Sequence, residues 1–178
     1  MEAEETILQN EVAIKKFKEL VNDINICMFT TIDKGHAITS RPMVTTSVDD
    51  EGNAWFFTNE FSEKVHEVNE DNAVNLIYSH PVKNIYLNVK GSSSLIIDRK
   101  KMEELWEPSL VSWFPQGLDD PKICLIKVAT ETAHFWNNSS SKMGLLFHMI
   151  RSITKGDTYK ETEKGKLNLN AAAPGTLP

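Results

Sequence analysis

Residues 55–64 join a hydrophobic, strand-like run to a helix start that carries a hydroxyl, Ser62, and a cation, Lys64. A helix N-terminus has unpaired backbone N–H groups and a partial positive charge, and both favour a bound anion. Lys64 in the first turn opposes this dipole unless a phosphate supplies negative charge that both side chains can contact. Taken alone, the segment favours an ordinary N-cap at Ser62 and a solvated Lys64. A phosphate site therefore needs support from elsewhere in the chain.

Arg41 and Pro42 lie in a second strand-like segment, which the polar turn at residues 49–52 should place beside residues 55–59. The planar guanidinium of Arg41 suits a phosphate or the oxygens of a planar heterocycle. Proline removes a ladder donor, so Pro42 indicates an edge, a bulge or a ligand facing that backbone. A solvent-facing ion pair with an acidic residue explains Arg41 equally well.

The elements that must position these residues are mostly strands. β-branched and aromatic residues bounded by turn signals predict six strands, at residues 26–32, 37–48, 53–59, 73–79, 84–98 and 122–135. Helical spacing of apolar residues predicts four helices, at residues 7–24, 61–70, 99–106 and 142–154. The first three strands should form an antiparallel meander, and the whole should fold as a closed or split barrel with peripheral helices.

Length and composition predict one domain over residues 1–166 and a loose tail over residues 167–178. The net charge of -6 argues against nucleic acid and anionic membrane surfaces as partners. No signal-like N-terminus or run of about 20 apolar residues occurs, so we expect a cytoplasmic protein. Cys27 and Cys124 are expected to be buried thiols, and the dispersed histidines predict no metal site.

Three features in this order, Arg41-Pro42-Met43, Phe57-Thr58 and the Ser62/Lys64 helix start, resemble the flavin-binding split-barrel proteins related to pyridoxamine phosphate oxidases. Within that superfamily the chain is similar to the general stress protein 26 group of FMN-binding proteins. The resemblance covers residues 13–136 and includes the segment Trp-Phe-Pro-Gln-Gly-Leu-Asp-Asp-Pro at residues 113–121. It implies a mainly β fold, a six-stranded antiparallel split barrel of the FMN-binding type.

The resemblance also implies which residues surround the flavin. It assigns Arg41, Pro42 and Met43 to the pyrimidine side of the flavin. Phe57 and Thr58 are assigned to the ring and the ribityl chain, and Ser62 and Lys64 to the phosphate. Further candidates, for a second wall of the pocket, are Tyr78, Ser79, Trp113 and Phe114. In the family a second subunit supplies that wall, so a homodimer is implied. Plain packing explains Trp113 and Phe114 equally well.

The chain departs from the parent enzymes where those bind phosphate and substrate. Thr45 and Thr46 follow the Arg41 strand where the enzymes have further basic residues, Glu63 separates Ser62 from Lys64, and no Arg-x-His motif occurs. We therefore expect no oxidation of pyridoxamine phosphate and a modest affinity for FMN.

Two functions fit these residues. In the first, FMN accepts hydride from NADH or NADPH and passes electrons to an unidentified small acceptor, with no residue identifiable as a catalytic acid or base. In the second, the protein binds or buffers flavin without turnover. A variant of either replaces FMN by a deazaflavin or by haem, and haem would need an axial ligand such as His134 or His148.

Overall fold

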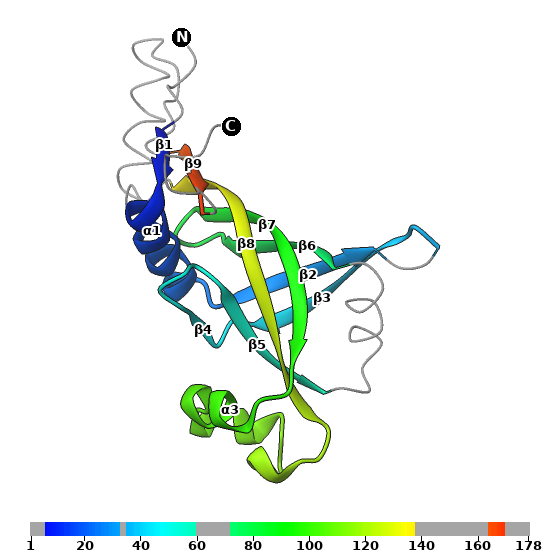
Figure 1. Ribbon diagram of the computed structural model, residues 1–178. Helices are drawn as coiled ribbons and strands as arrows, with labels where there is room; N and C mark the ends of the chain where they lie inside the picture. Colours follow the sequence, from blue (N-terminus) through cyan, green and yellow to red (C-terminus); the bar gives the residue numbers. More distant parts are fainter. Residues whose placement is uncertain (1–5, 33–34, 60–71, 138–163, 170–178) are drawn as a thin grey trace, which may run out of the picture.

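The computed structural model describes residues 6–32, 35–59, 72–137 and 164–169 (Figure 1). In chain order, the elements are β1 (Thr6–Gln9), α1 (Asn10–Asp23), β2 (Ile26–Ile32), β3 (Ile38–Val44), β4 (Ser47–Val48), β5 (Ala54–Asn59), β6 (Ala73–His80), β7 (Ile85–Ile96), α3 (Arg99–Leu105), the 3-10 helices η1 (Pro108–Ser112) and η2 (Gly117–Asp119), β8 (Ile123–Asn137) and β9 (Lys164–Asn168). No helix in these ranges is long and apolar enough to cross a bilayer.

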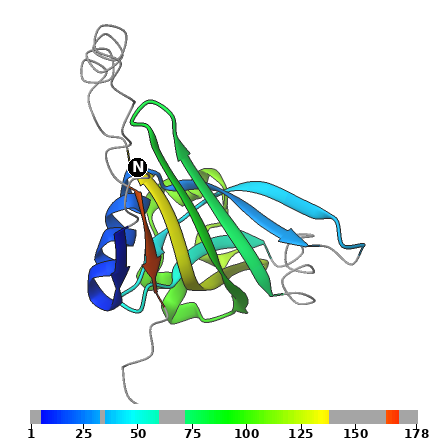
Figure 2. The same ribbon diagram turned by 90° about the horizontal axis from the view of Figure 1, so that it is seen from above.

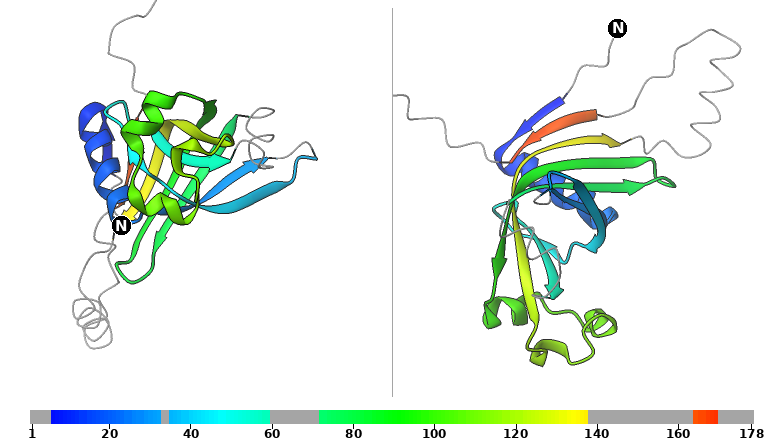
Figure 3. Two further views of the ribbon diagram at one scale, coloured as in Figure 1. Left: turned by 90° about the horizontal axis from the view of Figure 1, so that it is seen from below. Right: turned by 90° about the vertical axis from the view of Figure 1, so that its right-hand side faces the viewer.

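The strands form one curved sheet that does not close on itself. Its order is β1-β9-β8-β7-β6-β2-β3, while β5 pairs with β8 and with the short β4. The long β8 serves both ends of the molecule, since its first half pairs with β5 and its second half with β9. At Gly91 a bulge shifts the β7–β8 register, and a Cβ there would clash with the Ala129 carbonyl oxygen. The predicted split barrel is confirmed, with helices at its periphery (Figure 3).

The described strands number nine rather than the predicted six. The segment predicted at residues 37–48 is divided into β3 and β4, because the backbone N–H of Thr45 turns to the Asn25 carbonyl and that of Thr46 to the Trp55 carbonyl. The predicted antiparallel meander of the first three strands is confirmed in part, because β2 pairs with β3 and β4, the end of the second predicted strand, pairs with β5. β5 pairs with β8 instead of β3, a pairing distant in sequence that no turn signal reveals.

The ends of the chain also differ from prediction. The first helix begins at Asn10, and Thr6–Gln9 form a strand parallel to β9. The loose tail predicted from Leu167 is wrong at its start, because Leu167 and Asn168 belong to β9 and Leu167 is fully buried. Figure 2 shows β1 and β9 side by side next to α1. The helices predicted at residues 61–70 and 142–154, and residues 170–178, lie outside the described residues.

Two apolar clusters hold the sheet and helices together. The larger fills the barrel under α1, where Phe29 meets Phe56 edge to face at 5.4 Å between ring centroids. The smaller joins the far end of β5 and β8 to the helical segment that contains α3, η1 and η2, and is built from Trp55, Phe57, Met102, Leu110, Ile123 and Leu125. The two cysteines are buried thiols, as predicted. The helical segment is thus attached through a core of its own.

Asp49 organises the β4–β5 turn next to this smaller cluster. Its Oδ1 accepts from the backbone N–H groups of Glu51 and Asn53, and its Oδ2 accepts from the Asn53 amide and from Trp55 Nε1, at 2.8 to 3.0 Å. Burial raises the pKa of the Asp49 carboxyl, but these hydrogen bonds outweigh burial and hold it below its ordinary value of 3.8. Above the Trp55 ring, 5.1 Å from its centroid, lies the Lys101 ammonium of α3.

Asp49→Asn is expected to lower the free energy of unfolding by about 2 kcal/mol at pH 7, because an amide N–H₂ would face two donors and leave Trp55 Nε1 unpaired. Since the folded-state pKa is depressed, the ionised carboxyl stabilises the fold above its ordinary value of 3.8, and this contribution is lost as the pH falls through the lowered value. Urea denaturation at pH 7 and pH 3 should show the difference from wild type shrinking in acid.

The matched control is Asp50→Asn, which removes only an ion pair between Lys18 and a fully exposed Asp50 carboxylate. It should change the unfolding free energy by less than about 0.5 kcal/mol at either pH. Equal effects of the two substitutions at pH 7 would contradict the role of Asp49.

Candidate functional site

A cavity of about 530 Å³ lies between the strands and the helical segment. The strand side of its lining comes from β2, β3, the β3–β4 link and β5, and consists of Ile26, Pro42, Met43, Val44, Thr46, Phe57, Thr58 and Asn59. The helical side comes from η1 and the residues after it, and consists of Ser109, Leu110, Trp113 and Phe114. Segments that are distant in the sequence therefore share one cavity.

Most of the predicted site residues that the structure describes meet in this cavity. Those that line it are Pro42, Met43, Phe57, Thr58, Trp113 and Phe114. Ser62 and Lys64 lie outside the described residues, so the predicted phosphate site stays a prediction. The last described residue before them is Asn59, which lines the cavity itself.

Three predicted site residues do not line the cavity. Arg41 is half-buried on β3, opposite Phe29 of β2. Tyr78 is fully buried in the barrel, where its hydroxyl lies 2.8 Å from the Thr45 hydroxyl and burial raises its pKa well above the ordinary value. Ser79 is exposed on the outer face of β6. Neighbouring strand residues face opposite ways, so Tyr78 and Ser79 cannot both face one ligand.

The strand wall is placed by the position of β3 in the sheet. β3 ends the strand order, and an edge strand tolerates the missing N–H of Pro42, as the sequence indicated. Pro42 and Val44 point to the exposed face of β3, whereas Met43 points to the buried face. All of them line the cavity, which lies against this end of the strand order.

The helical wall of the cavity is held in place by its packing on Phe57 of β5. Its ring meets the Trp106 ring edge to face at 5.6 Å and the Phe114 ring at 6.2 Å between centroids. Phe57 is almost fully buried and belongs both to the cavity lining and to the smaller core. The same packing that stabilises the helical segment therefore sets the width of the cavity.

The lining suits a planar heterocycle with polar edges. Its walls are mainly aromatic and aliphatic, and none of the described residues that line it is charged. Thr46 Oγ1 is buried without a hydrogen-bond partner among the described residues, an unfavourable state that a polar ligand edge would relieve. Thr46 was not predicted as a candidate site residue. The sequence was used only to note that Thr46 stands where the parent enzymes have a basic residue. Nothing in the sequence marks Ile26, Val44 or Ser109 as residues that line a cavity.

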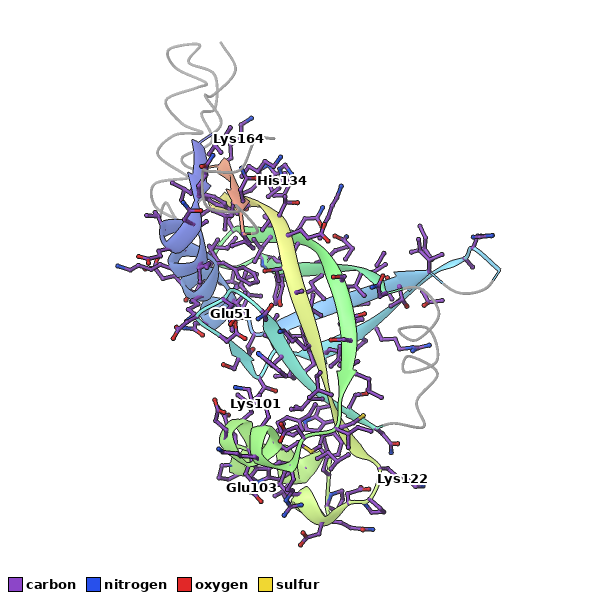
Figure 4. All side chains as sticks on the ribbon, viewed as in Figure 1. Glu51, Lys101, Glu103, Lys122, His134 and Lys164 are labelled. Carbon is purple, nitrogen blue, oxygen red and sulfur yellow. The ribbon has the colours of Figure 1, made fainter. Side chains whose placement is uncertain are left out.

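Other chemistry finds less support in the described part of the chain. No group of three or more His, Cys, Asp or Glu side chains there could hold a metal ion. His134 does not line the cavity. Figure 4 shows it beside Lys164, at the opposite end of the molecule from Lys101 and Glu103 of α3. His148, the other candidate haem ligand, lies outside the described residues.

Solved structures with the same fold include a protein from Jannaschia sp. CCS1 assigned as general stress protein 26. It is 21% identical with a TM-score of 0.73, and the match covers 86% of this chain and 96% of that one. The general stress FMN/FAD binding protein from Xanthomonas citri is 25% identical with a TM-score of 0.61, and the match covers 74% and 92% of the two chains.

Sequence comparison gives a consistent result. Protein bli-3 of Neurospora crassa is 25% identical over 139 residues, which is 72% of this chain and 66% of bli-3. Residues 12–160 match the family described as pyridoxamine 5'-phosphate oxidase like, and this range contains every predicted site residue. The chain belongs to the pyridoxamine 5'-phosphate oxidase-like family.

Proposed function

We propose that the protein binds FMN in the cavity between β3, β5 and η1. The observation that carries the proposal is the meeting of Pro42, Met43, Phe57 and Thr58 around one cavity. Its described lining is uncharged and mainly apolar, and it includes the buried Thr46 hydroxyl, which has no hydrogen-bond partner among the described residues. Family membership supports the same ligand, as does the likeness to the Xanthomonas citri protein, which is named for FMN/FAD binding. Bound flavin would supply the redox chemistry, while the walls bind it, orient it and exclude water.

The phosphate of this flavin is assigned to Ser62 and Lys64. Asn59 lines the cavity at the end of β5, and Ser62 follows three residues later in the sequence. Only a short span of sequence thus separates both groups from the cavity wall, and a hydroxyl and an ammonium suit a phosphate.

A second copy of the chain is proposed to complete the cavity. The outer face of the sheet exposes a continuous set of apolar side chains across β2, β6, β7 and β8, namely Ile26, Met28, Ile77, Tyr86 and Trp136. The strand register supports their continuity, since Met28 is opposite Ile77 and Tyr86 opposite Trp136. Ile26 belongs both to this face and to the cavity lining, so a copy docked here would cover the cavity.

As to activity, we propose an oxidoreductase of the cytoplasm in which NADH or NADPH reduces the flavin and a small acceptor reoxidises it. The second candidate is a flavin-binding protein without turnover, favoured by the lack of any titratable side chain among the described lining residues. Steady-state oxidation of NADH or NADPH by the FMN-loaded protein separates the two. Oxidation of pyridoxamine phosphate is not expected, because the described walls offer no cation for the substrate phosphate.

The cofactor-free protein should bind FMN saturably in a titration followed by quenching of flavin fluorescence. The Ser62→Ala, Lys64→Ala double variant should bind at least about 10-fold more weakly, which corresponds to about 1.4 kcal/mol. Lys100→Ala, which removes an exposed cation of α3, is the control and should bind as wild type does. Equal binding by the double variant rejects the phosphate site. Absence of binding by wild type rejects FMN, and the same titration with a deazaflavin and with haem follows.

A further inference from the structure

Trp113 combines two properties that seldom occur together. It lines the cavity, yet 73% of its surface is exposed. An indole is the largest apolar side chain, and a free one at the mouth of a cavity gains most when it covers a ligand. The other aromatic residues of the lining, Phe57 and Phe114, are buried or half-buried by contact with each other.

The backbone that carries Trp113 is held rigidly. The N–H groups of Trp113 and Phe114 both donate to the Leu110 carbonyl at 2.9 Å, and Leu110 is anchored in the smaller core. Gly117, at a φ of 62° that few other residues adopt, reverses the chain and donates to the Phe114 carbonyl at 2.8 Å. The indole is therefore presented from a fixed turn, so a ligand need not order the backbone when it binds.

Arg99 fastens this turn to α3. Its guanidinium donates to the Leu118 carbonyl, to the Asp119 carboxylate at 3.2 Å and to the Glu103 carboxylate at 2.8 Å. The planar fork of arginine can serve these acceptors together, which a lysine cannot. The segment before and after Trp113 is thus tied down on both sides, by Leu110 and by Arg99.

The residues across the cavity from Trp113 determine which kind of molecule could bind between them and the indole. Val44, a lining residue of β3 to which the flavin proposal gives no role, presents aliphatic surface, and no described lining residue carries a charge. A charged molecule would lose hydration there with no counter-charge among these residues, whereas a flat uncharged one would gain contact on both faces.

We propose that Trp113 is a specificity-determining residue, which stacks on an uncharged planar aromatic molecule bound in the outer part of the cavity beside the flavin. This inference rests on the proposed function, because it assigns the partner of the same flavin. Trp113 would favour flat, uncharged molecules, and Arg99 would act as a positioning residue that holds the turn.

The test uses two probes of nearly identical shape that differ in charge, 4-nitrobenzamide and 4-nitrobenzoate. Their binding to FMN-saturated protein is measured by isothermal titration calorimetry with the flavin oxidised. Wild type should bind the amide at least about 10-fold more tightly than the carboxylate. Trp113→Ala should weaken amide binding about 10-fold, and Trp113→Phe, which keeps a stacking ring, should stay within about threefold of wild type. Val111→Ala, an exposed neighbour on η1 that does not line the cavity, should match wild type.

FMN affinity is measured separately for each variant, so that the two proposals fail in different ways. If FMN does not bind, the proposed function fails. If FMN binds but the amide does not, or the carboxylate binds equally well, only the stacking site is rejected. Loss of a dimer in the Trp113→Ala variant on sedimentation would also reject it, because Trp113 would then contact a second copy.

Discussion

Phe57→Ala is expected to lower the free energy of unfolding by about 3–5 kcal/mol and to weaken FMN binding at the same time. The substitution removes a buried ring that contacts both Trp106 and Phe114, so it opens a void in the smaller core and loosens one wall of the cavity. Urea denaturation measures the first effect, and titration with FMN under fully folding conditions measures the second.

The adjacent residue supplies a matched control. Phe56 is fully buried and Phe57 almost fully, but Phe56 points into the larger cluster, where it contacts Phe29. Phe56→Ala should therefore destabilise the fold by a similar amount while FMN affinity changes little. If both variants lose FMN affinity equally, the loss reflects general destabilisation, and Phe57 does not set the cavity wall.

Leu167→Ala is expected to lower the free energy of unfolding by about 3 kcal/mol, although composition alone marks Leu167 as the start of a loose tail. Its side chain is fully buried in the larger cluster, and β9 lies between β8 and β1. Denaturation midpoints with urea measure the change. Lys166→Ala, on the partly exposed face of the same strand, should change stability by less than about 0.5 kcal/mol. A neutral Leu167→Ala would restore the loose-tail prediction.

Local signals in the sequence predicted local structure well. β2 matches its predicted bounds, and the polar turn with Asp49 and Gly52 does form a hairpin, between β4 and β5. The pairings that sequence reasoning missed, β5 with β8 and β1 with β9, join residues far apart in the chain. Such pairings are determined by shared burial, and no residue type or spacing marks them.

Part of the candidate site could be predicted because motif residues from separate segments keep a recognisable order. Pro42, Phe57 and Trp113 were identified in this way, and they line one cavity. Thr46 was overlooked because a lone threonine is unremarkable until its hydroxyl is seen to be buried without a partner. Alternation along a strand could have shown from the sequence that Tyr78 and Ser79 do not both face one ligand, whereas only the structure shows that Tyr78 is the buried one.

The parallel pairing of β1 with β9 also constrains how the protein is made. Thr6 pairs with Gly165, so a ribosome releases the first strand long before its partner exists. Until β9 emerges, residues 132–136 of β8 form an unpaired strand edge, and the space in the apolar core that Leu167 later fills is still empty. The nascent chain therefore completes this side of the sheet only after β9 has emerged, and its exposure to association is greatest just before that point.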